Sequence, residues 1–135
     1  MGKRVDRVQE VGSVGFKKVP LLDGEVVIKT GECGHRLWRR LGMLGWSGGL
    51  LILTDKRLIW TPNWFARIYA APVVTALSEV RDVRQYRKTH FFAPYDQWLA
   101  ETDSGSLVFG FGLLTMGRDD SVDWIEALRA CQANP

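Results

Sequence analysis

Short segments of alternating hydrophobic and polar residues occupy most of the chain. In the segment 25–30 (EVVIKT), side chains fall alternately on two faces, which is the two-residue period of a β-strand. We expect this strand to end at the glycine-containing segment 31–34. Alternation or a short apolar run between turn residues predicts six further strands: 50–53, 58–61, 68–77, 80–88, 95–102 and 106–111.

The hydrophobic period changes near the C-terminus. Val122, Ile125 and Leu128 follow one another at intervals of three, and Trp124 widens the apolar stripe. Carboxylates near the first turn favour the positive end of a helix dipole. Three residues supply them: Asp119, Asp120 and Asp123. The pattern predicts a helix of about 12 residues with one apolar face that packs on the sheet.

The order of these elements predicts a mainly β, antiparallel fold. All the predicted strands precede the single helix, so the sequence lacks the strand-helix-strand units that build parallel sheets. A chain of 135 residues that is 46% hydrophobic forms one domain with its own core. We therefore predict one domain of seven antiparallel strands and a C-terminal helix.

Composition argues against several other classes. The longest apolar run, residues 48–53, falls far short of the roughly 18 residues of a membrane span. The first residues lack the apolar stretch of a secretory signal. Cys33 and Cys131 are too far apart in sequence to suggest a disulfide framework or a metal cluster. We expect a cytoplasmic protein with reduced thiols, no metal and no cofactor.

A hairpin and three shorter motifs occur in a characteristic order. The segment 49–60 (GLLILTDKRLIW) contains a glycine, an apolar strand, Leu-Thr, a turn, Lys-Arg-Leu and an aromatic residue. Segments 24–27 (GEVV) and 77–83 (LSEVRDV) flank this hairpin, and 123–125 (DWI) lies in the predicted helix. The hairpin resembles the signature of the GRAM domain, a family of the pleckstrin-homology-like superfold. The other segments resemble its opening strand, its step into the fifth strand and its last helix.

The resemblance implies both a fold and a class of function. It implies a PH-like, seven-stranded antiparallel barrel or orthogonal sandwich capped by one C-terminal helix. It divides the chain into an N-terminal extension, 1–23, and a GRAM/PH-like domain, 24–132. It also implies a non-enzymatic module that binds phosphoinositides, other anionic membrane lipids or protein partners. Within the hairpin, we expect Lys56 and Arg57 to set the turn geometry rather than to bind phosphate.

The charged residues are unevenly distributed. The formal net charge is +3, but residues 1–90 carry 16 Lys and Arg against 8 Asp and Glu, whereas residues 91–135 carry 2 against 7. Such asymmetry predicts a molecule with one basic and one acidic face. A basic face attracts anionic lipid, nucleic acid or an acidic protein. We expect the basic residues of the strand 80–88 to be solvated and paired with neighbouring acids, which disfavours a nucleic-acid partner.

The segment 35–47 combines cations with large apolar side chains, and we expect a loop with a helical turn here. Guanidinium groups bind phosphate bidentately, and each basic residue gains about 1 kcal/mol near an anionic surface. Tryptophan favours the membrane interface because its ring is apolar and its N–H is polar. The candidate headgroup ligands are Arg36, Arg39 and Arg40. The candidate residues for membrane insertion or partner contact are Trp38, Leu41, Met43, Leu44 and Trp46.

Two other segments repeat this chemistry. In the segment 62–72, Trp64 and Phe65 are candidate contact residues, and Arg67 is a further candidate headgroup ligand. Between the predicted strands 80–88 and 95–102, two adjacent phenylalanines follow three basic or titratable residues: Arg87, Lys88 and His90. If the three segments share one end of the barrel, they form a single basic and aromatic rim.

These residues allow more than one hypothesis. The leading one is peripheral association with an anionic membrane through the segment 35–47. The alternative is a protein-interaction or self-association module, for example a homodimer, that uses the same aromatic residues. The apolar residues of this segment could instead fold back and cap the barrel, because soluble monomers avoid large exposed apolar patches. Cys33 and His35 have no third group to orient them as a catalytic pair, so we expect no enzymatic activity.

Overall fold

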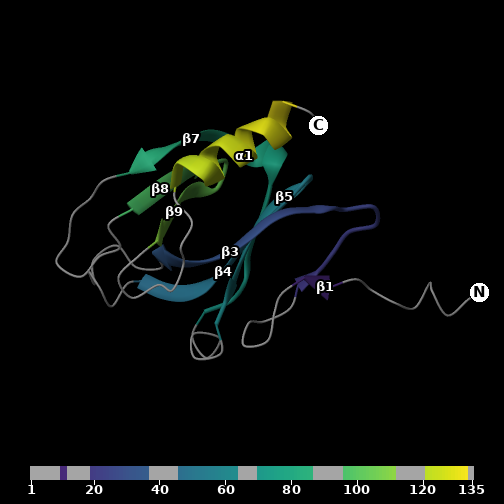
Figure 1. The fold of residues 1–135 in the computed structure, drawn as a ribbon, viewed down its shortest axis with the longest axis horizontal. Helices are drawn as coiled ribbons and strands as arrows, with labels where there is room; N and C mark the ends of the chain where they lie inside the picture. Colours follow the sequence, from purple (N-terminus) through teal and green to yellow (C-terminus); the bar gives the residue numbers. More distant parts are fainter. Residues whose placement is uncertain are drawn as a thin grey trace, which may run out of the picture.

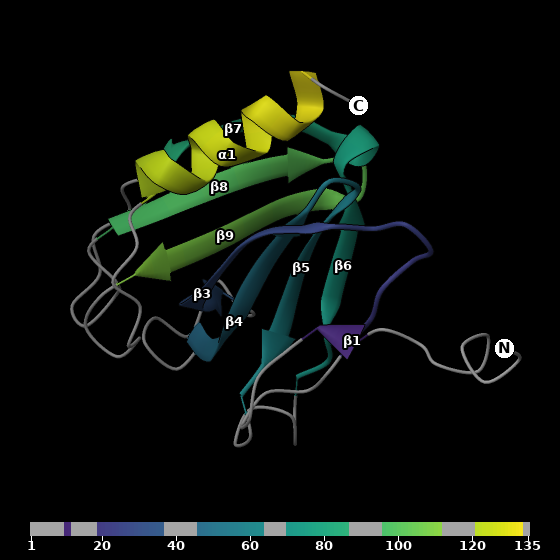
Figure 2. The same cartoon turned by 45° about the vertical axis from the view of Figure 1, so that its right-hand side comes forward.

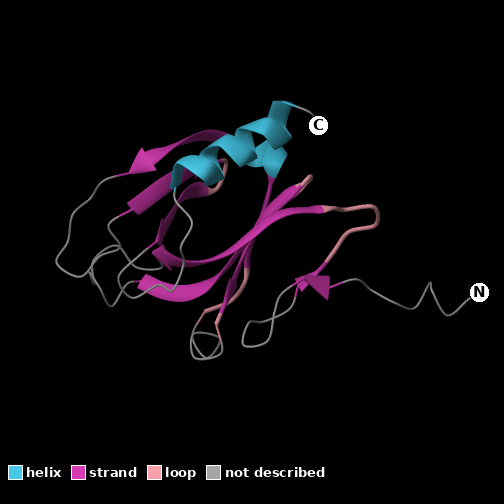
Figure 3. Cartoon of the chain, in the orientation of Figure 1, coloured by secondary structure: helices cyan, strands magenta, loops and turns pink. Residues whose placement is uncertain are grey.

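A computed structural model describes the strands and the helix of the chain. The described residues are 10–11, 19–36, 46–63, 70–86, 96–111 and 121–133. Figure 1 and Figure 3 show the elements in chain order and by type. They are β1 (Glu10–Val11), β2 (Val19–Pro20), β3 (Val27–Arg36), β4 (Trp46–Thr54), β5 (Arg57–Pro62), β6 (Val73–Ala76), the 3₁₀ helix η4 (Leu77–Glu79), β7 (Val80–Tyr86), β8 (Asp96–Thr102), β9 (Gly105–Phe111) and α1 (Ser121–Ala133).

Seven of these strands form one bent antiparallel sheet in the order β6-β5-β4-β3-β9-β8-β7. Its two halves meet at β3 and β9, which pair through Gly34 with Gly110 and His35 with Phe109. In Figure 2, strands β8 and β9 run across the direction of β4, β5 and β6, and α1 lies over the open side. The predicted seven-stranded antiparallel fold with one C-terminal helix is confirmed.

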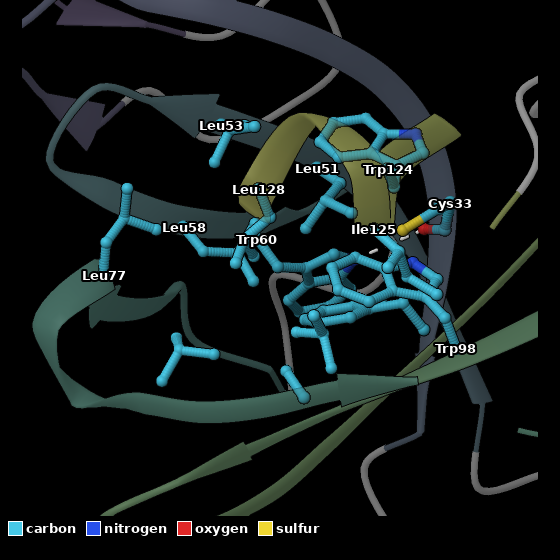
Figure 4. Close-up of a cluster of buried hydrophobic side chains, with 14 of the residues drawn as sticks. Cys33, Leu51, Leu53, Leu58, Trp60, Leu77, Trp98, Trp124, Ile125 and Leu128 are labelled. Carbon is cyan, nitrogen blue, oxygen red and sulfur yellow. Dashed lines mark hydrogen bonds between the residues drawn. The ribbon is translucent and has the colours of Figure 1, made fainter. Parts of the chain in front are cut away.

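The main core lies between the sheet and the helix. Trp60, Trp98 and Trp124 are fully buried there, and the rings of Trp98 and Trp124 stack with centroids 6.4 Å apart. Ile125 and Leu128 complete the buried face of α1, as the three-residue spacing predicts (Figure 4). Val122, the first residue of the predicted stripe, is 44% exposed, so its place in the stripe was wrong. The helix therefore closes the core.

A smaller cluster covers the outer face of the sheet. Val19 of β2 packs on Leu50, Ile52 and Ile59, each less than 9% exposed. Strand β2 pairs with β1 in a two-stranded sheet that the residue pattern did not predict. Part of the N-terminal extension thus buries apolar side chains of β4 and β5.

The predicted end of the first strand at residues 31–34 is wrong. Strand β3 continues to Arg36, and β4 begins at Trp46, so the predicted loop 35–47 includes four strand residues at its edges. Gly34 lies opposite Gly48 in this longer hairpin. A Cβ on Gly49 would lie 2.5 Å from both the Thr61 carbonyl oxygen and the Trp60 ring. Glycines here permit close packing instead of interrupting the strand.

Replacing Gly49 with Ala should lower the free energy of unfolding by about 1–3 kcal/mol, because the methyl group would collide with the backbone and an indole. Gly48→Ala is the matched control. Its methyl group would meet the amide nitrogen of the Asn63 side chain at 2.8 Å instead of backbone and a buried ring, so its loss should be smaller. Urea unfolding of both variants measures the difference, and equal losses would contradict the packing role of Gly49.

Candidate functional site

The strand ends that border three cation-rich segments lie at one end of the sheet. Segment 37–45 joins β3 to β4, segment 64–69 follows β5, and segment 87–95 joins β7 to β8. Cross-strand register brings the bordering ends together through the pairs Arg36–Trp46, Gly49–Pro62, Gly34–Gly110, Asp96–Phe111 and Tyr86–Gln97. In Figure 2, the arrowhead of β9 points to the lower left and that of β5 to the bottom of the view, because the two halves of the sheet cross. We call the end of the sheet that holds these pairs the basic-aromatic end.

The three segments 37–45, 64–69 and 87–95 have an unusual composition. Together they contain five Arg or Lys residues, seven aromatic residues and no Asp or Glu. The five cations are Arg39, Arg40, Arg67, Arg87 and Lys88. Each segment adjoins strand ends on the same edge of the bent sheet, so the charge excess belongs to segments of that edge.

Two of the predicted contact residues lie in the described structure. Arg36 and Trp46 form a cross-strand pair at the edge of the hairpin, and both are partly exposed. Their position in strands corrects the prediction that both belong to a loop. The other predicted contact residues lie outside the described residues: Trp38, Arg39, Arg40, Leu41, Met43, Leu44, Trp64, Phe65 and Arg67. The phenylalanines of segment 87–95 also lie outside them.

Segment 112–120 leads from the basic-aromatic end into α1 and carries Arg118, Asp119 and Asp120, which also lie outside the described residues. In the described structure, Asp96 of β8 binds the start of α1, and its Oδ2 accepts the Ser121 N–H at 2.9 Å. The sequence pattern located the acids near the helix start but did not indicate Asp96, because it lies 25 residues away.

The opposite end of the sheet carries acidic turns. Backbone hydrogen bonds join these turns: Asp55 N–H donates to Val26, Leu77 N–H to Lys56, and Asp103 N–H to Glu79. The carboxylates at this end, which we call the acidic end, belong to Asp23, Asp55, Glu79 and Asp103. The same turns also carry Lys56 and Arg57, so this end holds charges of both signs.

The hairpin cations hold the turns of the acidic end. Lys56 Nζ donates to the Asp23 carbonyl at 3.1 Å. Arg57 binds both carboxylate oxygens of Glu25, at 2.7 and 2.8 Å, and the Pro20 carbonyl at 2.9 Å. Lys56 and Arg57 therefore have a structural role, but they join the hairpin to the segment 20–25. The hairpin turn itself is held by Thr54, whose Oγ1 accepts the Lys56 and Arg57 N–H groups at 3.1 and 2.8 Å.

The basic residues of β7 form exposed ion pairs. Arg81 pairs with Asp103 at 2.5 Å, and Arg84 pairs with Asp82 at 3.1 Å and with Glu101 at 3.3 Å. The expected pairing of Arg81 and Arg84 with neighbouring acids is confirmed. Such exposed pairs each contribute at most about 1 kcal/mol to stability.

Cys33 and His35 are parts of the core. The Cys33 side chain is 1% exposed, so its thiol has no access to a substrate in the folded state. His35 Nδ1 lies 3.0 Å from the Val108 carbonyl oxygen, to which it donates, and the imidazole packs between Trp60 and Phe109. Burial lowers the pKa of His35 to about 4, and the charge of Arg36 adds to the effect.

This burial predicts a loss of stability in mild acid. The unfolded chain protonates His35 near pH 6.5 whereas the folded chain does so near pH 4, so the free energy of unfolding rises with pH in this window. We expect a loss of about 2 kcal/mol between pH 7.5 and pH 5. His35→Asn, which can still donate to Val108, should remove most of this slope. His90→Asn, at the other histidine, should keep it, and an unchanged slope in His35→Asn would contradict the assignment.

The described residues contain no group of three or more His, Cys, Asp or Glu side chains that could hold a metal ion. Among the described elements, no helix is long and apolar enough to cross a membrane.

Comparison with known proteins identifies the fold. No family model and no curated protein sequence matches the chain. One similar solved structure is the Vps36 N-terminal PH domain, with a TM-score of 0.58 and 18% identity over 95% of this chain and 92% of that one. Another is the C-terminal domain of an unknown protein from Leishmania infantum, with a TM-score of 0.58 and 14% identity over 83% and 88%. The chain has a PH-like fold.

Proposed function

We propose that this PH-like domain binds anionic membrane surfaces through its basic-aromatic end. The observation that carries the proposal is the composition of the three segments bordered by that end, 37–45, 64–69 and 87–95. They hold five cations and seven aromatic residues without one carboxylate. The turns at the opposite end hold charges of both signs, so an anionic surface would attract the basic-aromatic end more strongly.

Two kinds of side chain would share the binding energy. Each basic residue near an anionic leaflet contributes about 1 kcal/mol, and this contribution weakens with salt. Tryptophan and other large apolar side chains contribute at the interface. The proposed headgroup ligands are Arg36, Arg39, Arg40 and Arg67. The proposed inserting residues are Trp38, Leu41, Met43, Leu44, Trp46, Trp64 and Phe65.

The resemblance of residues 49–60 to the GRAM hairpin supports the same class of ligand, including phosphoinositides, whose phosphates match the guanidinium fork. The cytoplasmic leaflet carries the required negative charge. We accordingly propose peripheral, reversible association on the cytoplasmic side, with no catalytic step.

Sedimentation with lipid vesicles tests the proposal. We expect the protein to pellet with vesicles of phosphatidylcholine and phosphatidylserine, and to remain in the supernatant with phosphatidylcholine alone. Raising the salt from about 0.1 M to about 1 M shortens the Debye length from about 10 Å to about 3 Å and should release most of the bound protein. Equal binding to both vesicle types at both salt concentrations would contradict an electrostatic mechanism.

The protein-interaction hypothesis predicts a different outcome in vesicle binding and in a measurement of oligomeric state. It predicts indifference to lipid charge together with a concentration-dependent change in oligomeric state. Size-exclusion chromatography over about a hundredfold range of protein concentration measures that state. A dimer that forms without lipid and fails to bind anionic vesicles would replace membrane binding by self-association.

A further inference from the structure

A cavity of about 420 Å³ opens at the acidic end of the domain. It lies between the β4–β5 turn, the short helix η4 and the last turn of α1, and Figure 2 shows the C-terminal part of α1 above η4. Residues that line it include Asp55, Lys56, Leu77, Val80, Cys131 and Gln132. Its volume falls in the range of about 300–1,000 Å³ that is usual for small-ligand sites.

Hydrogen bonds fix the walls of this cavity. Gln132 Nε2 donates to the carbonyl oxygens of Leu77 and Val80, at 3.1 and 3.0 Å. The Leu77 N–H donates to the Lys56 carbonyl at 2.9 Å. The turn, η4 and α1 are thus joined directly, so a ligand would meet a preformed site.

The cavity lining holds one carboxylate, Asp55, and one ammonium group, Lys56, and the carboxylate is the group that would pair with a cation. Asp55 contributes a carboxylate whose Oδ1 accepts the Val26 N–H at 2.9 Å. The last turn of α1 has no basic residue, so the negative end of its dipole is not neutralised there. Lys56, the cation of the lining, directs its ammonium group to the Asp23 carbonyl.

The pKa of Cys131 responds to the same negative charge. Burial raises the pKa of its thiol, and the negative charge of Asp55 raises it further. The thiol is therefore neutral near pH 7 and adds no charge to the cavity. Leu77 and Val80, 6% and 7% exposed, supply an apolar floor beside the carboxylate.

We propose that this cavity binds an aliphatic cation, an alkylammonium or guanidinium group whose charge pairs with Asp55 and whose carbon chain contacts Leu77 and Val80. The group could belong to a small amine or to a lysine or arginine side chain of a protein partner, because both present the same chemistry. The proposal does not rest on lipid binding, since the cavity lies at the opposite end of the sheet from the basic-aromatic end.

An NMR titration of the full chain with n-butylammonium tests the proposal. We expect shifts in the backbone amides of Leu77, Cys131 and Gln132, and much smaller shifts with n-butanol, which has the same chain without the charge. Asp55→Asn keeps the acceptor for the Val26 N–H but removes the charge, and should weaken binding about fivefold. Asp103→Asn removes a carboxylate of the same end outside the cavity lining, and should leave the affinity unchanged.

Lys56→Gln is a second variant, and its expected effect on butylammonium affinity is opposite to that of Asp55→Asn. Lys56 is exposed, and loss of its positive charge should strengthen butylammonium binding about twofold. Three results would overturn the proposal. They are equal binding of butanol and butylammonium, equal weakening by Asp55→Asn and Asp103→Asn, and the absence of shifts with both the butylammonium and the lysine-peptide probes. If a short lysine peptide binds in an Asp55-dependent manner and butylammonium does not, the cation belongs to a protein side chain. If only butylammonium binds, the cation is a small amine.

Discussion

Replacing Arg57 with Met should lower the free energy of unfolding by about 3–5 kcal/mol, because it leaves the Glu25 carboxylate buried without its cation. The Glu25 side chain is 0% exposed and that of Arg57 is 14% exposed. Glu25 also accepts hydrogen bonds from Thr54 Oγ1 at 2.5 Å and from the Leu22 N–H at 2.8 Å. One carboxylate thus joins the N-terminal turn to the β4–β5 hairpin.

The protonation of Glu25 sets the pH range of this effect. Burial raises its pKa, but the hydrogen bonds from Arg57, Thr54 and Leu22 lower it more, to about 2. The folded-state pKa is thus below the unfolded value of 4.5, so the stabilisation is complete above about pH 4.5 and is lost as the pH falls toward 2. The Arg57→Met penalty should shrink over the same range.

Urea unfolding at pH 7 measures the penalty, with two comparisons. Arg81→Met removes one partner of an exposed pair and should cost less than about 1 kcal/mol. Glu25→Gln combined with Arg57→Met removes both buried charges and should recover part of the loss. A penalty for Arg57→Met no larger than that for Arg81→Met would contradict the structural role of the buried pair.

The fold could be predicted because its main signals are local. The alternation in the strand 106–111 and the three-residue spacing of the final helix each report burial on one face. The extension of β3 to Arg36 could not be predicted in this way, because Gly31 and Gly34 look like a strand end until their neighbours are known. The sheet of β1 and β2 was also not predicted, because Val19 is buried through contacts with strands that are distant in sequence.

The candidate site was predictable in composition but not in arrangement. The cations and aromatic residues of each segment are visible in the sequence, whereas their attachment to one end depends on the register of five strand pairings. The Glu25–Arg57 pair spans 32 residues, and no local pattern links its members. The cavity lined by Asp55 and Cys131 likewise arises only when the end of α1 meets the β4–β5 turn.

Reversing two charges in segment 37–45 should almost abolish vesicle binding. The double variant Arg39→Glu and Arg40→Glu changes the local charge by four units, which at about 1 kcal/mol per unit charge near an anionic surface is about 4 kcal/mol. The affinity for anionic vesicles should therefore fall more than about a hundredfold. The fold should be unaffected, so the unfolding midpoint in urea is the internal check.

The matched control reverses two arginines elsewhere on the surface. Arg81 and Arg84 lie exposed on β7 in ion pairs, and the double variant Arg81→Glu and Arg84→Glu makes the same change in net charge. Both double variants carry the same formal net charge, so a difference in their vesicle binding reports the location of the reversed charges.

The most direct measurement is vesicle sedimentation of these two double variants beside the unmodified chain, on phosphatidylserine-containing vesicles at about 0.1 M salt, where charges act over about 10 Å. Binding through the basic-aromatic end predicts that Arg39→Glu with Arg40→Glu stays in the supernatant. It also predicts that Arg81→Glu with Arg84→Glu pellets within about threefold of the unmodified protein. Equal loss in both variants, or full binding by the first, would contradict it.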